Sequence, residues 1–196
     1  TLKLVHRRGE LMHREATRNK GAMHAVIGLS REHLDGLVAQ VTDQGPVSVA
    51  NHNTAEQIVT TGAPDAVKAV SALAKEQGAK AIPLKVSGAW HSELIRGAEA
   101  DFGACLEGTA FNAPQVPVLH NVTADTCADP GAIRELMARQ LCSPVRWYDT
   151  VQRLAAEGVT DFVELGPGKV LTGLVKKSLP KGYAATLHNV FDTASL

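Results

Sequence analysis

The sequence has no excess of charge of either sign. Its 196 residues carry 20 Lys and Arg against 20 Asp and Glu, so the formal net charge at pH 7 is zero. Proteins that bind nucleic acids concentrate basic side chains on one face to neutralise phosphates, and no basic cluster of that kind occurs here. A nucleic-acid partner is therefore not expected.

Cysteine is also scarce, and the spacing of the few cysteines is uninformative. Cys105, Cys127 and Cys142 are odd in number and lack CxxC spacing, so neither a complete disulfide framework nor a zinc site is expected. No pair of the eight histidines has the HExxH spacing of a metalloprotease. The sequence therefore predicts no metal site, and its cysteine usage fits a reducing cytoplasm.

Long apolar runs are missing too. No run approaches the roughly 18 residues of a membrane helix, and residues 1–8 do not lead into the apolar core of a signal peptide. The composition, with 44% hydrophobic and 20% charged residues, is that of an ordinary globular protein. We expect neither membrane association nor export.

Two phosphate-binding motifs can be excluded by their spacing. Gly166-Pro167-Gly168-Lys169 resembles part of a phosphate loop, but Val163 stands where the first glycine should be and Val170 follows the lysine. Gly28 does not belong to a dinucleotide-binding GxGxxG. The first of these segments is therefore predicted to be a tight turn between a strand and a helix.

The chain begins with amphipathic helical spacing. Leu4, Val5, Leu11 and Met12 share one side of the expected helix, and Arg8 falls in the middle of that apolar side. Arg8 either snorkels or pairs with Glu15, or it is a cation held inward for an anionic substrate. Because the pattern starts at once, we also expect further sequence upstream.

Residues 20–86 alternate short β-rich runs with helical patterns. The expected strands are residues 25–29, 47–50, 57–62 and 80–86, and the expected helices are residues 31–41 and 64–77. The resulting order βαββαβ predicts a ferredoxin-like subdomain.

Residues 87–196 have a different pattern. Helices are expected over residues 92–107, 130–141 and 147–157, and a further helix follows the turn at residues 166–169 and runs through residue 177. Strands are expected over residues 117–122, 162–165 and 183–190. This alternation predicts an α/β layer with a mostly parallel sheet. Residues 1–19 and 87–196 would then form a large α/β subdomain, into which the small subdomain of residues 20–86 is inserted.

His91 is the histidine whose position points to chemistry. It follows an expected strand and the residues Ser87-Gly88-Ala89-Trp90, and a strand-to-helix junction would project it from the edge of a sheet. A purely structural histidine is the alternative that the residues alone leave open.

An ordered set of motifs along nearly the whole chain resembles the malonyl-CoA:acyl carrier protein transacylase family. The matching segments are residues 4–12, 21–23, 51–53, 57–59, 86–92, 111–114, 121–122, 139–141 and 166–173. The resemblance implies a partial α/β-hydrolase-like large subdomain with an inserted ferredoxin-like subdomain. It also implies that malonyl passes through a serine ester, from coenzyme A to the phosphopantetheine thiol of an acyl carrier protein, in fatty acid or polyketide synthesis without any cofactor.

The same resemblance implies roles for individual residues. His91 would act as base and then acid, and the backbone carbonyl of Gln140 would hold its Nδ1 hydrogen. Arg8 would bind the malonyl carboxylate in a bidentate manner, which agrees with its place on the helix. Trp90 would be a bulky wall that disfavours branched acyl groups, although core packing explains an aromatic residue there as well.

One family feature is absent from the sequence. The family carries its nucleophile in a Gly-His-Ser-Leu-Gly elbow ahead of the arginine helix, and no serine of this chain lies in a GxSxG context. Ser92 is a poor substitute, because adjacent side chains rarely point at one another productively. We therefore expect the serine upstream of Thr1, in a missing segment or a second chain, and no catalysis by this chain alone. An inactive fragment, a non-catalytic module that binds acyl-CoA or carrier protein, and an interaction module built on the small subdomain are the alternatives.

Overall fold

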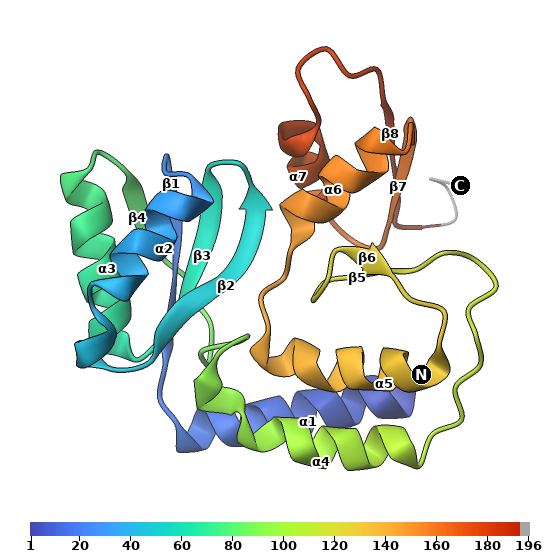
Figure 1. Ribbon diagram of the computed structural model, residues 1–196, viewed down its shortest axis with the longest axis horizontal. Helices are drawn as coiled ribbons and strands as arrows, with labels where there is room; N and C mark the ends of the chain where they lie inside the picture. Colours follow the sequence, from blue (N-terminus) through green and yellow to red (C-terminus); the bar gives the residue numbers. More distant parts are fainter. Residues whose placement is uncertain (193–196) are drawn as a thin grey trace.

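A computed structural model describes residues 1–192, which form three groups of elements (Figure 1). The α-helices are α1 (Leu2–Arg18), α2 (Arg31–Ala39), α3 (Pro64–Glu76), α4 (Gly97–Glu107), α5 (Pro130–Arg139), α6 (Trp147–Ala156) and α7 (Val170–Ser178). The strands are β1 (Ala22–Ile27), β2 (Val47–Thr54), β3 (Gln57–Gly62), β4 (Lys80–Pro83), β5 (Leu119–His120), β6 (Asp125–Thr126), β7 (Asp161–Leu165) and β8 (Thr186–Val190). Short 3-10 turns are η1 (Thr42–Gln44), η2 (Glu93–Ile95) and η3 (Gln140–Cys142).

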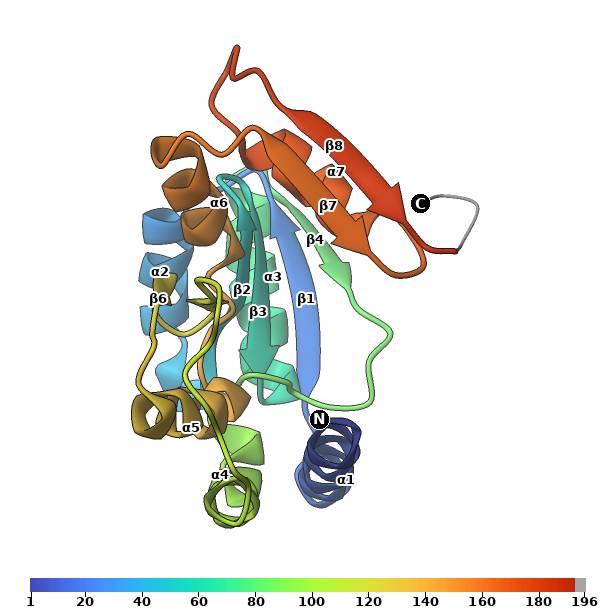
Figure 2. The ribbon, with the colours of Figure 1, turned by 90° about the vertical axis from the view of Figure 1, so that its right-hand side faces the viewer.

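The first group is a four-stranded antiparallel sheet with the strand order β2-β3-β1-β4. Helices α2 and α3 cover one of its faces (Figure 2). This order and this placement of both helices confirm the predicted βαββαβ, ferredoxin-like arrangement. The residue limits of the two subdomains stay a prediction.

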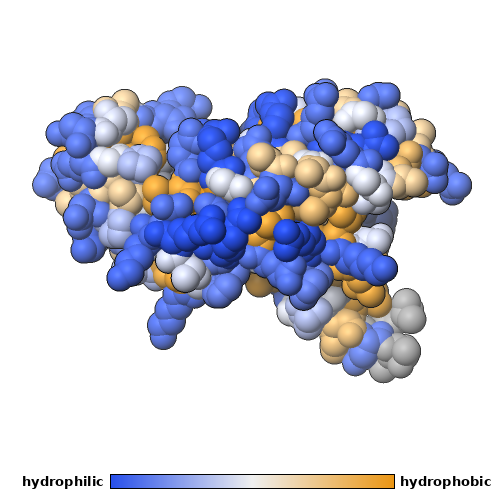
Figure 3. Space-filling view, turned by 90° about the horizontal axis from the view of Figure 1, so that it is seen from below, coloured by the Kyte–Doolittle hydropathy of each residue, from blue (hydrophilic) through white to orange (hydrophobic). Residues whose placement is uncertain are grey.

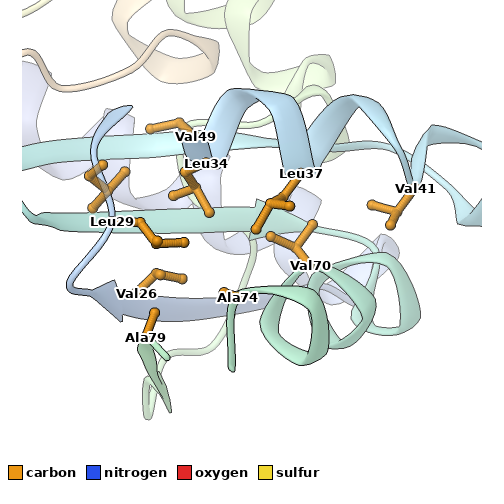
Figure 4. Packing of buried hydrophobic residues seen from close by; sticks show 10 residues of the cluster. Val26, Leu29, Leu34, Leu37, Val41, Val49, Val70, Ala74 and Ala79 are labelled. Carbon is orange, nitrogen blue, oxygen red and sulfur yellow. The ribbon is translucent and has the colours of Figure 1, made fainter. Parts of the chain in front are cut away.

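The core of this group lies between the sheet and its two helices (Figure 4). Leu34 and Leu37 of α2 and Val70 of α3 meet Val26 of β1, and all four are at most 3% exposed. Leu34 and Leu37 are three residues apart, which places them on one face of α2. Burial of this apolar surface stabilises the sheet against its helices.

Helices α1, α4 and α5 lie side by side and form the second group (Figure 1). Leu11 of α1, Phe102 and Leu106 of α4 and Leu141 are each at most 1% exposed and pack together. Val5, which we placed on the apolar side of α1, is instead 63% exposed. Figure 3 shows this underside of the molecule, where hydrophilic side chains dominate and hydrophobic patches lie between them.

The third group contains α6, α7 and a parallel pair of strands, β7 and β8. Within residues 1–192 the predicted parallel sheet consists of these two strands only. The last strand begins at Thr186 rather than at residue 183, because the backbone N–H of Tyr183 donates to the Pro180 carbonyl at 3.0 Å in a turn and does not pair with β7. The tight turn predicted at residues 166–169 is present between β7 and α7.

Two further elements differ from the sequence predictions. The strand expected over residues 117–122 pairs only at Leu119 and His120, in a short antiparallel ladder with β6. The helix expected over residues 92–107 is divided at Arg96 into the 3-10 turn η2 and helix α4. No helix among the described residues combines the length and the apolar character needed to cross a bilayer.

Candidate active site

His91 lies in the loop between β4 and η2, in an unusual backbone conformation. Its φ of 61° lies in the left-handed region, which residues other than glycine rarely adopt. Such strain is common at functional sites, where the surrounding structure holds it in place. The conformation directs the His91 side chain toward the end of α5, where the imidazole is partly buried.

Gln140 meets His91 across 49 residues of sequence. The Nδ1–H of His91 donates to the backbone carbonyl of Gln140 at 3.0 Å. Gln140 follows the last residue of α5, and its carbonyl, which has two lone pairs, accepts from the Ser143 N–H at 3.5 Å as well as from His91. Its own side-chain amide donates to the carbonyl of Ser143 at 3.2 Å, which fixes the turn that presents this carbonyl.

This bond determines which ring nitrogen can act as a base. A carbonyl oxygen accepts but cannot donate, so Nδ1 must carry the proton and Nε2 keeps its lone pair. Burial lowers the pKa of His91, partly offset by the carbonyls of Gln140 and Ser143, and the charge of Arg8 lowers it further. The imidazole is therefore neutral at pH 7 and able to accept a proton at Nε2.

Arg8 lines a cavity of about 380 Å³ beside this pair. The cavity is also lined by Phe102, Leu119, His120, Asn121, Val122, Leu136, Met137 and Gln140. Gln140 thus connects the two halves of the site, since its carbonyl holds His91 and it borders the space that contains Arg8. A volume of this order is typical of small-molecule sites.

The Arg8 guanidinium is partly buried, and within residues 1–192 no carboxylate forms an ion pair with it. The alternative pairing with Glu15 is wrong, because Glu15 accepts from Arg14 at 2.8 Å and from Arg18 at 3.2 Å. Burial lowers the pKa of Arg8, yet a guanidinium stays charged in proteins. The site therefore contains a desolvated cation that can bind an anion.

Trp90 lies elsewhere. It packs against Met23, Ala25, Ala50 and Val59, on the sheet face opposite α2 and α3. Of the described residues, those that line the Arg8 cavity do not include Trp90. Its role in acyl selectivity stays a prediction, and its contacts are those of a core residue.

The structure adds site residues that the sequence did not single out. Leu136 and Met137 of α5 line the Arg8 cavity four and three residues before Gln140, so one helix face supplies all three. His120 of β5 lines the cavity as well. The sequence signal for Leu136 and Met137 was their helical spacing from Gln140, whereas no sequence signal pointed to His120.

Residues 1–192 contain no group of three or more His, Cys, Asp or Glu side chains that could hold a metal ion. Cys105, Cys127 and Cys142 are all free thiols. Burial raises the pKa of Cys142 to about 12, so this thiol is not a thiolate at neutral pH.

Comparisons with known proteins agree with this geometry. The acyl transferase domain model matches residues 1–190. The malonyl CoA-acyl carrier protein transacylase of Bacillus subtilis is 45% identical over 175 residues, which cover 88% of this chain and 55% of that protein. The transacylase of Haemophilus influenzae is 40% identical over 190 residues, with 96% and 61% covered.

Solved structures give the same result. An acyl carrier protein S-malonyltransferase from Vibrio cholerae superposes with a TM-score of 0.92 at 41% identity, covering 98% of this chain and 62% of that one. A malonyl transacylase in complex with its type II PKS acyl carrier protein has the same TM-score and coverage at 38% identity. The chain thus spans 55 to 61% of the length of the curated relatives described above. With a domain model matched over residues 1–190 and this structural agreement, the chain belongs to the acyl transferase domain family.

Proposed function

We propose that this chain is the histidine-bearing part of a malonyl-CoA:acyl carrier protein transacylase. The observation that carries the proposal is the Nδ1–H of His91 held at 3.0 Å by the Gln140 carbonyl, next to a cavity that contains the unpaired Arg8. A base with a fixed tautomer and a partly buried cation are two of the groups that transfer of a carboxylated acyl chain requires, beside a nucleophile.

In the first half-reaction His91 Nε2 takes the proton of a serine hydroxyl as the serine oxygen bonds to the thioester carbonyl carbon of malonyl-CoA. The imidazolium then gives this proton to the sulfur of coenzyme A as the carbon–sulfur bond breaks, which leaves a malonyl-serine ester. In the second half the phosphopantetheine thiol of an acyl carrier protein gives its proton to His91 and attacks the ester. The serine oxygen leaves and takes the proton back.

The Gln140 carbonyl has the orienting role that a carboxylate has in a triad. It fixes the ring and its tautomer, but it adds no full negative charge beside the imidazole. The pKa of His91 therefore stays lowered by burial. A base of lowered pKa remains neutral between half-reactions and is ready for the next proton.

Arg8 is proposed to bind the free carboxylate of the malonyl group. A planar guanidinium can donate two parallel hydrogen bonds to a carboxylate. Because no carboxylate within the described residues occupies this cation, its desolvation is compensated only when an anion binds. An acyl group without a carboxylate would gain nothing from it.

The nucleophile is proposed to belong to a part of the enzyme outside these 196 residues. No serine of the chain lies in a GxSxG context, and the relatives are longer. The parallel pair β7 and β8 supports this view, because parallel sheets are normally covered on both faces and contain more strands. Val163 and Leu165 of β7 are instead 55% and 78% exposed.

The remaining proposals follow from the same assignment. The acyl carrier protein and malonyl-CoA would be the partners, no cofactor would be needed, and the reaction would take place in the cytoplasm. Trp90 would disfavour branched acyl groups only through the packing of its loop, since it does not line the Arg8 cavity.

A chimera tests the proposal. The part of the Bacillus subtilis relative that lies outside the match, which we expect to carry the nucleophilic serine, is fused ahead of Thr1. Incubated with malonyl-CoA, the chimera should form a malonyl-serine ester that mass spectrometry detects, and His91→Ala should abolish it. His13→Ala is the matched control, because His13 is an exposed histidine on α1. Unchanged ester formation in the His91→Ala chimera would refute the proposal.

A further inference from the structure

Ser92 forms two hydrogen bonds on either side of His91. Its hydroxyl donates to the carbonyl of Ala89 at 2.7 Å and accepts from the backbone N–H of Leu94 at 3.2 Å. The residue is 3% exposed. One buried hydroxyl thus ties the chain before His91 to the chain after it.

The segment before His91 is fixed by close packing. Ala89 is fully buried, and a Cβ added at Gly21 would lie 2.4 Å from the Ala89 Cβ. A Cβ added at Gly88 would lie 2.5 Å from the Ala16 Cβ. Ala89 is therefore a rigid anchor, and the bond from Ser92 connects the strained His91 backbone to it.

We propose that Ser92 is the positioning residue that holds His91 in its left-handed conformation, so that the imidazole Nδ1–H meets the Gln140 carbonyl. A backbone at φ 61° relaxes toward the ordinary regions unless its neighbours prevent it. The Ser92 hydroxyl opposes that relaxation from both directions. Gln140 fixes the far end of the same contact.

The hydroxyl of Ser92 is not a nucleophile. Its single hydrogen is donated to Ala89, and its oxygen accepts from Leu94. Both bonds lie within the loop itself. Ser92 therefore acts through His91 rather than on a substrate, which explains why a serine adjacent to the base does not replace the missing nucleophile.

A simpler role would be capping alone, because Ser92 is also the N-cap of η2. The two roles differ in what they do to His91. Loss of a cap lowers stability and leaves the His91 ring where it is, whereas loss of a positioning bond lets the ring leave Gln140. Ser30 supplies the matched control, since its side chain caps α2 by accepting from the N–H of His33 at 3.3 Å.

Nitrogen-15 NMR of the histidine rings in the 196-residue chain tests the proposal without requiring catalysis. In the unaltered chain His91 should show the Nδ1–H tautomer with a hydrogen-bonded Nδ1 proton. Ser92→Ala should give a mixture of tautomers and a rapidly exchanging proton, while Ser92→Thr and Ser30→Ala should keep the original signals. A folded Ser92→Ala chain with unchanged His91 signals would overturn the proposal.

A second variant covers the case in which Ser92→Ala does not fold. Ser92→Cys keeps the shape of the side chain with a somewhat larger atom but is a much weaker donor and acceptor. The same loss of the single tautomer is therefore expected, and unchanged signals would again overturn the proposal. Only the predicted effect of Ser92 substitution on catalysis rests on the proposed function. In the chimera, Ser92→Ala should lower kcat roughly ten- to hundredfold with little change in KM, and a change confined to KM would contradict positioning. An inactive unaltered chimera would refute the proposed function and leave the NMR result standing.

Discussion

Replacement of Arg8 by alanine should separate malonyl from acetyl transfer. Arg8 is the charged side chain that lines the cavity of about 380 Å³ beside Gln140, and within residues 1–192 no carboxylate is paired with it. The substitution removes the cation without breaking an ion pair of the folded chain. Its effect should therefore fall on the bound acyl group.

The magnitude follows from the two hydrogen bonds that a guanidinium donates to a carboxylate. A hydrogen bond to a charged group contributes about 1.5–3 kcal/mol, so loss of both costs roughly 3–6 kcal/mol. At about 1.4 kcal/mol per factor of ten, kcat/KM for malonyl-CoA should fall by roughly a hundred- to a ten-thousandfold. Acetyl-CoA has no carboxylate, and its transfer should change little. Arg8→Lys keeps the charge but loses the fork, so its malonyl rate should lie between the two.

The assay is acyl transfer to an acyl carrier protein by the chimera, with malonyl-CoA and acetyl-CoA compared in parallel. Arg7→Ala is the control, because Arg7 is the neighbouring arginine on α1, exposed and bonded to Glu10 at 3.2 Å. It should change neither rate. An equal loss of malonyl and acetyl transfer in Arg8→Ala would refute the carboxylate clamp.

Three further outcomes are expected. Gly21→Ala should lower the free energy of unfolding by about 1–3 kcal/mol in urea titrations, because the new Cβ would lie 2.4 Å from the Ala89 Cβ. Gly36→Ala is the control and should not lower it, because nothing lies within 4 Å of a Cβ added there. Equal effects of the two variants would contradict the close packing at Gly21. Burial lowers the pKa of His91 in the folded chain. Below the ordinary histidine pKa of about 6.5 the unfolded chain therefore binds more protons than the folded chain, and stability is lost as the pH falls below that value. His91→Asn should lose less stability than the unaltered chain between neutral pH and pH ~5, and an identical loss would argue against a buried neutral imidazole. Cys142, whose pKa is raised to about 12 by burial, should resist iodoacetamide in the native chain and react in urea; rapid native labelling would contradict its burial.

Much of the fold follows from local patterns. The order βαββαβ could be predicted because each element carries its own period, two for the strands and three to four for the helices. The division at Arg96 could not, because apolar spacing continues across a single 3-10 turn. The short pairing of Leu119 and His120 depends on β6, a partner that no periodicity in residues 117–122 reveals.

The site was less accessible to sequence reasoning. The helical pattern left several alternatives for Arg8, and the structure excludes one of them, the pairing with Glu15, because Glu15 accepts from Arg14 and Arg18 instead. The contact between His91 and Gln140 joins residues 49 positions apart, so only the family resemblance indicated it. The left-handed backbone of His91 has no local signal, since that conformation is normally associated with glycine or asparagine.

The central claim is that this chain contains the base and the carboxylate clamp of an acyltransferase but not its nucleophile. The most direct measurement is the intact mass of the purified 196-residue chain after incubation with malonyl-CoA, beside that of the chimera. We expect the malonyl adduct on the chimera and no adduct on the chain alone. A malonyl ester on a serine of the chain alone, with release to an acyl carrier protein, would contradict the account.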